Sequence, residues 1–227
     1  MAIAVWFSSC DQITGNGNIR TEKRNVSDFH GVKSGGSIDI EIKNGDTYAV
    51  SVEDDDNLLP YIITEVNDGI LNVYYKSNTS INEDHAKVYV TAPSLDKIVA
   101  AGSADIIAND ILKNTKNIDM NVSGSGSIKG EVDAPSITIS VVGSGNIDLT
   151  GRTKDFSGKV SGSGDLNCGK LQSEHATITV SGSGNAHIFS SVHLSATVSG
   201  SGDVYYGGNP QNPEIHTTGS GSVQEEK

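Results

Sequence analysis

A column of polar residues recurs at one position of a glycine-rich repeat, and its carboxylates are the first candidates for chemistry. Each member stands three residues after the leading glycine of a Gly-Ser-Gly-type motif. The members of this corner column are Asp105, Ser127, Asn146, Asp165, Asn185, Asp203 and Ser222. If successive repeats stack about 4.8 Å apart, Asp165 and Asp203 stand two repeats, or roughly 10 Å, apart. That separation is too wide for a retaining glycosidase but suits an inverting one.

The surroundings of the corner column favour a structural role. No Arg or Lys recurs beside these residues, and Asp, Asn and Ser readily form hydrogen bonds at tight corners. A calcium ladder is the alternative, but the calcium-binding nonapeptide reads Gly-Gly-x-Gly-x-Asp. Here the acid directly follows the glycine, and the period is about twice as long. We therefore predict a hydrogen-bonded ladder.

A second repeated position could bind a metal. His175 and His193 each lie seven residues before a leading glycine, and Asp155 takes the same place one repeat earlier. Stacked repeats would bring two imidazoles and a carboxylate together, which is a ligand set for zinc. Solvated loop positions are the alternative. The sequence indicates no other cofactor.

Three tyrosines are candidates for binding. Tyr74, Tyr89 and Tyr205 alternate with apolar positions, so their rings are expected to face outward. Exposed aromatic rings can stack on sugars or anchor a partner protein. Packing between coils or sheets is the alternative.

Two further features are weaker candidates for a functional site. The acidic run Glu53-Asp54-Asp55-Asp56 could attract Ca²⁺, whose ligands are carboxylates and carbonyls; a solvated loop is the alternative. Cys168 alternates inward, so we expect a small buried apolar residue and no nucleophile.

The repeat itself dominates the sequence after residue 100. The motif Val-Ser-Gly-Ser-Gly-Asp/Asn/Ser recurs with leading glycines at Gly124, Gly162, Gly182 and Gly200, with variants at Gly143 and Gly219 and a degenerate first copy at Gly102. Strict alternation precedes each corner, as in Ile137-Thr138-Ile139-Ser140-Val141, and indicates a half-buried strand. A second short strand follows, as in Ile147-Asp148-Leu149. The glycines supply positive φ between the two strands.

These repeats predict a right-handed parallel β-solenoid with rungs of about 19 residues. Aligned on the leading glycine, apolar residues form columns two residues before it and four residues after it. One rung cannot bury its own apolar face, so rungs must stack. We expect irregular β coils or a capping subdomain over residues 26–92, regular rungs over 93–223, and a tail over 224–227.

The first residues suggest a lipid anchor. Residues 1–10, an apolar run that ends in Ser-Ser-Cys10, are similar to the end of a bacterial lipoprotein signal, although the basic region is missing. Acyl chains on Cys10 would anchor the protein, and the polar residues 11–25 would form a tether. An ordinary apolar start with a buried cysteine is the alternative.

Composition excludes several classes of protein. The 227 residues include 28 acids and 16 bases, a net charge of −12, which argues against general nucleic-acid binding. The sequence contains no run of 18 apolar residues, the length that a membrane-spanning helix needs. The glycine motifs open strands, so they offer no phosphate site at a helix N-terminus and no nucleophile elbow.

The chain resembles the head GIN domain family of auto-transporter adhesins, common in Bacteroidetes. The resemblance rests on the glycine-rich rungs and on Phe29-His30-Gly31-Val32, Ser37 to Ile42, Asp55 to Pro60 and Ala92 to Leu95. It covers residues 26–223. It implies a β-helix-like fold and a location in the cell envelope, and it implies no catalytic residues.

We therefore expect an envelope lipoprotein of the outer membrane or cell surface that binds or scaffolds. A glycan or a protein is the expected ligand, with contact to the membrane only through the lipid. The last rung shows no cap, so pairing between copies is a further expectation. A polysaccharide lyase or hydrolase and a purely structural envelope protein are the alternatives.

Overall fold

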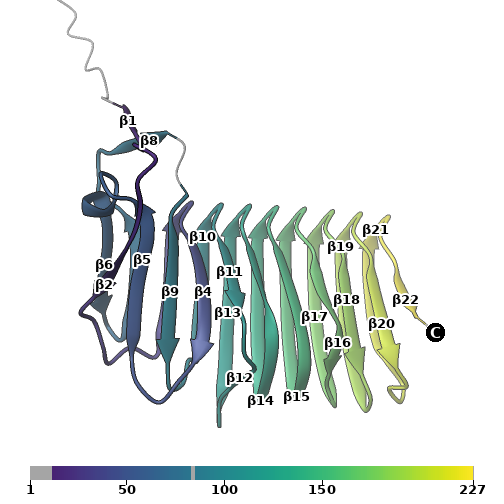
Figure 1. Ribbon diagram of the computed structural model, residues 1–227. Helices are drawn as coiled ribbons and strands as arrows, with labels where there is room; N and C mark the ends of the chain where they lie inside the picture. Colours follow the sequence, from purple (N-terminus) through teal and green to yellow (C-terminus); the bar gives the residue numbers. More distant parts are fainter. Residues whose placement is uncertain (1–11, 83–84, 227) are drawn as a thin grey trace, which may run out of the picture.

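The computed structural model describes residues 12–82 and 85–226, which form an elongated stack of strands (Figure 1). Cys10 lies outside the described residues. The elements of the N-terminal part are β1 (Gln12–Thr14), β2 (Ile19–Arg24), β3 (Gly31–Gly36), β4 (Asp39–Asn44), β5 (Ala49–Asp55), the 3₁₀ helix η1 (Leu59–Tyr61), β6 (Ile62–Asn67), β7 (Ile70–Tyr75), β8 (Ser80–Asn82) and β9 (Lys87–Ala92).

The repeat region continues the stack. Its elements are β10 (Lys97–Gly102), β11 (Asp105–Ala108), β12 (Leu112–Lys113), β13 (Asn117–Gly124), β14 (Ser127–Gly143), β15 (Asn146–Gly162), β16 (Leu166–Gln172), β17 (His175–Gly182), β18 (Ala186–Ser190), β19 (His193–Gly200), β20 (Val204–Gly208), β21 (Glu214–Gly219) and β22 (Val223–Glu225). All pairings from β10 to β22 are parallel. The predicted β-solenoid is confirmed.

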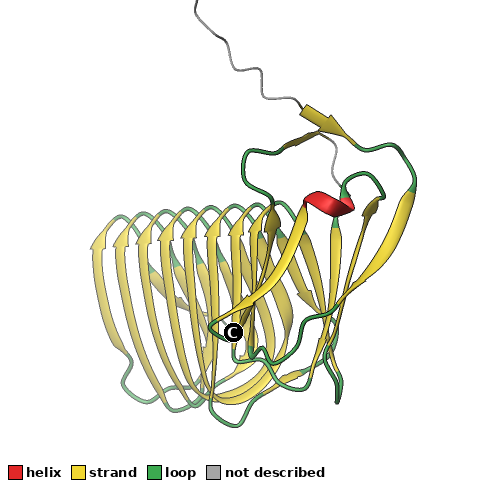
Figure 2. Cartoon of the chain, turned by 90° about the vertical axis from the view of Figure 1, so that its left-hand side faces the viewer, coloured by secondary structure: helices red, strands yellow, loops and turns green. Residues whose placement is uncertain are grey.

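Each rung has two walls that meet at the glycine corner (Figure 2). The first wall consists of the strands that end at the leading glycines, and the second wall consists of the strands that follow the corner. The leading glycines pair in register from Gly102 to Gly219, as the spacing predicts. The register also reaches back to Gly36, which pairs with Gly102. The regular stacking therefore begins at β3 and β4, before residue 93.

The corner leaves no space for a side chain. The leading glycines have positive φ, for example +125° at Gly162, where residues with a Cβ are strained. A Cβ on Gly162 would also collide with the carbonyl oxygen of Gly143 in the preceding rung. That rung's carbonyls are close because they bind the next corner: the Gly143 oxygen accepts hydrogen bonds from Ser163 N (2.8 Å) and Gly164 N (3.0 Å).

The core lies between the two walls. Alternation buries one face of most strands between the ends of the stack, so that Ile118, Met120 and Val122 point inward from β13. The column Val122, Val141, Val160, Val180 and Val198 is at most 1% exposed. Burial of each valine side chain stabilises the fold by about 1.5–3 kcal/mol. Cys168 is likewise buried, as predicted, and burial raises the pKa of its thiol to about 12.

Antiparallel strands close the N-terminal end of the stack. The segment between β4 and β10 folds back, so that β5 pairs antiparallel with β9 and β6 with β7. The segment interpreted as a tether contains two strands: β1 pairs with β8, and β2 pairs antiparallel with β5. Among the described residues, no helix is long and apolar enough to cross a membrane.

We predict that Gly162→Ala destabilises the fold by at least about 2 kcal/mol, because the alanine would be strained at positive φ and would displace the neighbouring rung. Gly35→Ala is the matched control. Gly35 is also a strand glycine, but an added Cβ would lie 3.5 Å from its nearest neighbour, an ordinary contact. Chemical denaturation measures both variants. Equal stabilities for Gly162→Ala and the native chain would contradict this account of the corner.

Candidate functional site

The corner column forms hydrogen bonds from rung to rung. The backbone N–H of Asn185 donates to Asp165 Oδ1 (2.7 Å), and that of Asp203 donates to Asn185 Oδ1 (3.0 Å). The same pattern joins Asn146 to Asp165, Asp203 to Ser222 and Asp105 to Ser127. Asp39 adds a further member, because its Oδ1 accepts the N–H of Asp105 (2.8 Å). The Asp and Asn side chains therefore satisfy the backbone of the next rung, whereas at Ser127 the ladder is interrupted and Asn146 N donates to the Gly126 carbonyl (3.1 Å).

The electrostatics of the column follow from these bonds. The Ser222 hydroxyl (2.7 Å) and then its backbone N–H (2.8 Å) donate to Asp203 Oδ1, and both lower the pKa of Asp203. Its carboxylate accepts hydrogen bonds that a protonated acid would lose. These carboxylates therefore act as hydrogen-bond acceptors in the fold.

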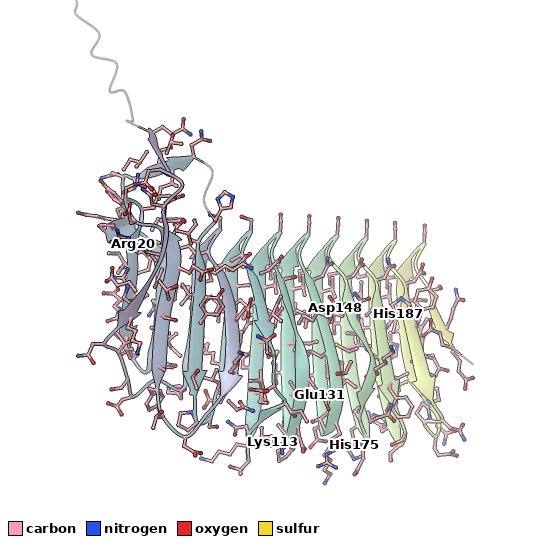
Figure 3. All side chains as sticks on the ribbon, viewed as in Figure 1. Arg20, Lys113, Glu131, Asp148, His175 and His187 are labelled. Carbon is pink, nitrogen blue, oxygen red and sulfur yellow. The ribbon has the colours of Figure 1, made fainter. Side chains whose placement is uncertain are left out.

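The candidate metal ligands share one register position. Asp155 pairs with His175, and His175 pairs with His193. The three residues start the first-wall strands, and Figure 3 shows His175 near the end of the rungs opposite the corner. In residues 12–82 and 85–226, however, no three His, Cys, Asp or Glu side chains are grouped so that they could hold a metal ion. The register aligns these residues without assembling a zinc site.

The three tyrosines fall on different walls. Tyr74 pairs with Gly35 on the first wall, and its hydroxyl donates to Glu65 (2.8 Å), which raises the pKa of Tyr74. Tyr89 and Tyr205 lie on the second wall. Burial and the nearby carboxylate of Glu53, to which the Tyr89 hydroxyl donates (3.2 Å), raise the pKa of Tyr89.

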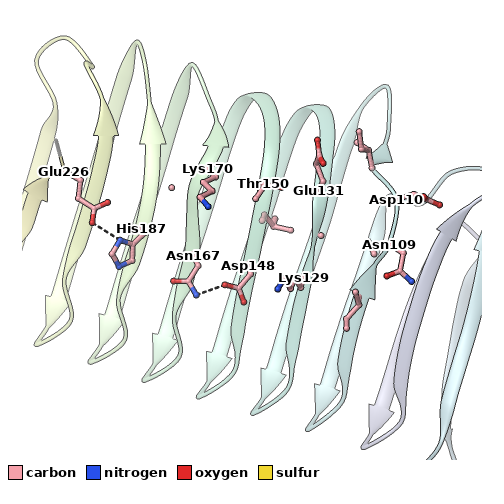
Figure 4. Close-up of a pocket in the computed structure, with 16 residues that line it drawn as sticks. Asn109, Asp110, Lys129, Glu131, Asp148, Thr150, Asn167, Lys170, His187 and Glu226 are labelled. Atoms are coloured by element: carbon pink, nitrogen blue, oxygen red, sulfur yellow. Dashed lines mark hydrogen bonds and ion pairs between the residues drawn. The ribbon is translucent and has the colours of Figure 1, made fainter.

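The second wall carries a groove with a volume of about 920 Å³ (Figure 4). Strands β11, β14, β15, β16 and β18 supply its floor. Its outward-facing lining includes Lys129, Asp148, Asn167 and His187, which occupy one register position in four successive rungs. The groove therefore runs across the rungs rather than along one strand.

Neighbouring side chains hold the groove's polar groups in place. Asn167 Nδ2 donates to Asp148 Oδ1 (2.8 Å), and His187 Nδ1 lies 3.2 Å from Glu226 Oε1 (Figure 4). The His187 ring also stacks on Tyr205, with centroids 4.8 Å apart and planes inclined by 16°. Two exposed apolar side chains, Ile107 and Ile111, lie at the other end. The lining thus combines a flat ring, amides, charges of both signs and an apolar end.

The groove belongs to a longer line of side chains, which we call the second-wall row. Its members pair one with the next through the sheet. They are Glu41, Ile107, Lys129, Asp148, Asn167, His187, Tyr205 and Gln224. Tyr89 extends the row at its N-terminal end, because Tyr89 pairs with Glu41. With about 4.8 Å per strand, Tyr89 and Tyr205 stand roughly 34 Å apart.

Sequence reasoning missed most of this row. From Ile107 onward its members stand five residues after each leading glycine, one residue beyond the buried column. The alignment on the leading glycines, which identifies the buried column, therefore also identifies the position of this row. The row is hard to recognise from the sequence because its residue types differ from rung to rung, whereas the corner column repeats Asp, Asn and Ser.

Fold and surface together define a β-solenoid repeat protein with an extended polar groove on one wall. The chain belongs to the head GIN domain family, described as a putative auto-transporter adhesin, whose pattern matches residues 28–210. The resemblance drawn from the sequence is thereby confirmed. No curated protein matches the chain's sequence.

Several solved structures of Parabacteroides and Bacteroides proteins are similar to this chain. A protein of Parabacteroides distasonis described as a putative lipid-binding protein is 27% identical, with a TM-score of 0.80 over 96% of this chain and 100% of the other. A putative adhesin of Parabacteroides merdae is 26% identical, with a TM-score of 0.76 over 96% and 100%. A putative adhesin of Bacteroides fragilis, 20% identical, shares the fold with a TM-score of 0.88 over 94% and 100%. The family and these neighbours are described as adhesins or lipid-binding proteins and not as enzymes.

We predict that Asp203 titrates below the usual range of an aspartate and that Ser222→Ala raises its pKa, because the hydroxyl donor is lost. The depressed pKa stabilises the fold above the unfolded value and loses that effect as pH falls through the folded value. An NMR titration of the Asp203 carboxyl carbon measures both forms. The Asp46 carboxyl, exposed on a turn, serves as the internal control. An unchanged Asp203 midpoint in the variant would contradict the assignment.

Proposed function

We propose that this protein is a non-catalytic adhesin-type surface module that binds an extended polymer along the second-wall row. The observation that carries the proposal is the groove of about 920 Å³, which crosses successive rungs without interruption. A repeating spacing of about 4.8 Å places one side chain of each rung along the row at regular intervals. A chain-like ligand can use many such weak contacts at once, whereas a small ligand would fill only part of the groove.

A glycan is the polymer that this lining suits best. The stacked His187 and Tyr205 rings offer a flat surface for the apolar face of a sugar. Asn167, Asp148 and Lys129 lie in the same row and supply donors and acceptors for hydroxyl groups. A mixed set of charges suits a neutral or zwitterionic glycan better than a polyanion, since the whole chain carries a net charge of −12.

The groove's acids support binding more than catalysis. Asp148 already accepts a hydrogen bond from Asn167, and Glu226 is paired with His187. A glycosidase or lyase needs a carboxylate pair, or a carboxylate with a cation, placed around one bond. Within the second-wall row the charges stand one per rung, and the groove's other acids, Asp110 and Glu131, lie outside the row. This arrangement supports a surface that holds a polymer without cleaving it.

The proposed location is the cell envelope, with the protein held by lipid on Cys10. The support is the family's adhesin description together with the apolar run that ends in Ser-Ser-Cys10. Cys10 lies outside the described residues. The anchored protein would expose its second wall to ligands beyond the membrane surface.

We predict that Tyr205→Ala weakens glycan binding at least about tenfold, because the ring platform in the row is lost. Array screening with polysaccharides identifies a ligand, and calorimetry then measures its affinity. The matched control is Tyr74→Ala, which removes a tyrosine from the first wall and should leave affinity within about twofold. Thermal melts establish that both variants fold.

Three outcomes would overturn the proposal. Equal losses in both tyrosine variants would place the ligand elsewhere. Binding to phospholipid vesicles or to a protein partner with no glycan bound would assign the row to another class of ligand. Release of new reducing or unsaturated ends from a bound polysaccharide would identify an enzyme.

A further inference from the structure

The acidic run at the end of β5 is buried, not a solvated loop. Asp54 and Asp55 are 0% and 4% exposed, whereas Asp56 is half-buried. The expectation of a solvated loop is therefore wrong for Asp54 and Asp55. Both carboxylates lie inside because the strand ends there and the loop between β1 and β2, residues 15–18, covers the turn. That loop is held by hydrogen bonds from Asp56 N to Asn18 O (3.0 Å) and from Asn57 Nδ2 to Thr14 O (2.9 Å).

Asp55 has no partner for its charge. Its Oδ1 is buried and receives no hydrogen bond, and none of the ion pairs among the described residues includes it. Arg20 pairs with the neighbouring acid instead, because its Nε lies 3.5 Å from Asp56 Oδ2. A buried carboxylate without a partner is unfavourable unless a proton or a cation neutralises it. The carboxylate therefore indicates a missing positive charge.

The carboxylate lies against the loop between β1 and β2. A Cβ on Gly15 would collide with Asp55 Oδ2, so the acid contacts the backbone of the covering loop directly. The amide oxygens nearby already accept backbone N–H groups: Asn16 N donates to Asn57 Oδ1 (3.1 Å), and Asn18 N donates to Asn16 Oδ1 (3.0 Å). Asn16 Nδ2 donates to Asp56 Oδ1 (2.6 Å), whereas Asp55 Oδ1 accepts no hydrogen bond.

We propose that this turn is a Ca²⁺ site in which Asp55 is the principal ligand and the neighbouring Asp56 and backbone carbonyls of the covering loop complete the shell. Calcium accepts carboxylate, amide and carbonyl oxygens in flexible geometry, and water fills the remaining positions. Magnesium requires nearly ideal octahedral ligands and dehydrates reluctantly, so it fits a mixed loop site less well. Zinc prefers the nitrogen and sulfur ligands that the described part of this turn does not supply.

The site would fasten the N-terminal segment to the solenoid. The covering loop joins β1 to β2, and β2 forms the antiparallel edge that closes the stack beside β5. A calcium ion bound between the end of β5 and the covering loop would neutralise Asp55 and hold the two segments together. The bound ion would thereby stabilise the pairing of β2 with β5. Calcium would then stiffen the segment that leads from the chain's start to the repeats.

Calorimetric titration of the native protein with CaCl₂ tests the site. We expect one ion bound per chain, a higher melting temperature with Ca²⁺ than with EDTA, and little effect of MgCl₂. Asp55→Asn should weaken Ca²⁺ binding at least tenfold and remove the effect of Ca²⁺ on the melting temperature. Asp46→Asn, which neutralises an exposed acid on another turn, should leave both properties unchanged.

The variant also separates a metal site from a buried acid that holds no ion. In the second case the native protein binds no Ca²⁺ up to about 10 mM, and Asp55→Asn melts at or above the native temperature in EDTA. That result would overturn the proposal, as would equal calcium binding by the native and Asp55→Asn proteins. Should Asp55→Asn fail to fold, Asp56→Asn provides the second ligand variant, with a smaller expected loss of affinity.

Discussion

The whole structure depends on the contact between one glycine corner and the next. The carbonyl oxygen of each leading glycine accepts two backbone N–H groups from the following corner, as the Gly102 oxygen does from Ser125 (2.8 Å) and Gly126 (3.1 Å). This close approach is available only because the corner has no Cβ and tolerates positive φ. The corner thereby sets the register of both walls.

Register then determines what each wall presents. A slip of one residue would turn every buried side chain outward, so the apolar columns and the glycine contacts support the same alignment. Because the corners are fixed, residues at equal distances from them form straight lines across the rungs. The side chains of the corner column form hydrogen bonds with backbone groups, and side chains of the second-wall row line the groove. One backbone constraint therefore yields a structural face and a candidate binding face.

The sequence predicts the repetitive part of the fold well, since period-two alternation and spaced glycines are local signals. It gives the register of Asp155, His175 and His193 correctly, yet register alone does not bring side chains into a ligand shell. It does not reveal that β3 and β4 already form a rung, because the pairing of Gly36 with Gly102 spans a long insertion. Burial of Asp55 depends on a loop contributed by distant residues, which no local pattern encodes.

The central claim is that the second-wall row is one straight line held by the corners, and a distance measurement tests it most directly. The labelled protein carries Glu41→Cys and Tyr205→Cys in a Cys10→Ser background, and the buried Cys168 stays unlabelled. The two labelled positions stand six strand spacings apart in the row. The account predicts a single narrow distribution centred near roughly 29 Å, widened only by the label linkers. A broad or multiple distribution, or a centre displaced by more than about two strand spacings, would contradict it.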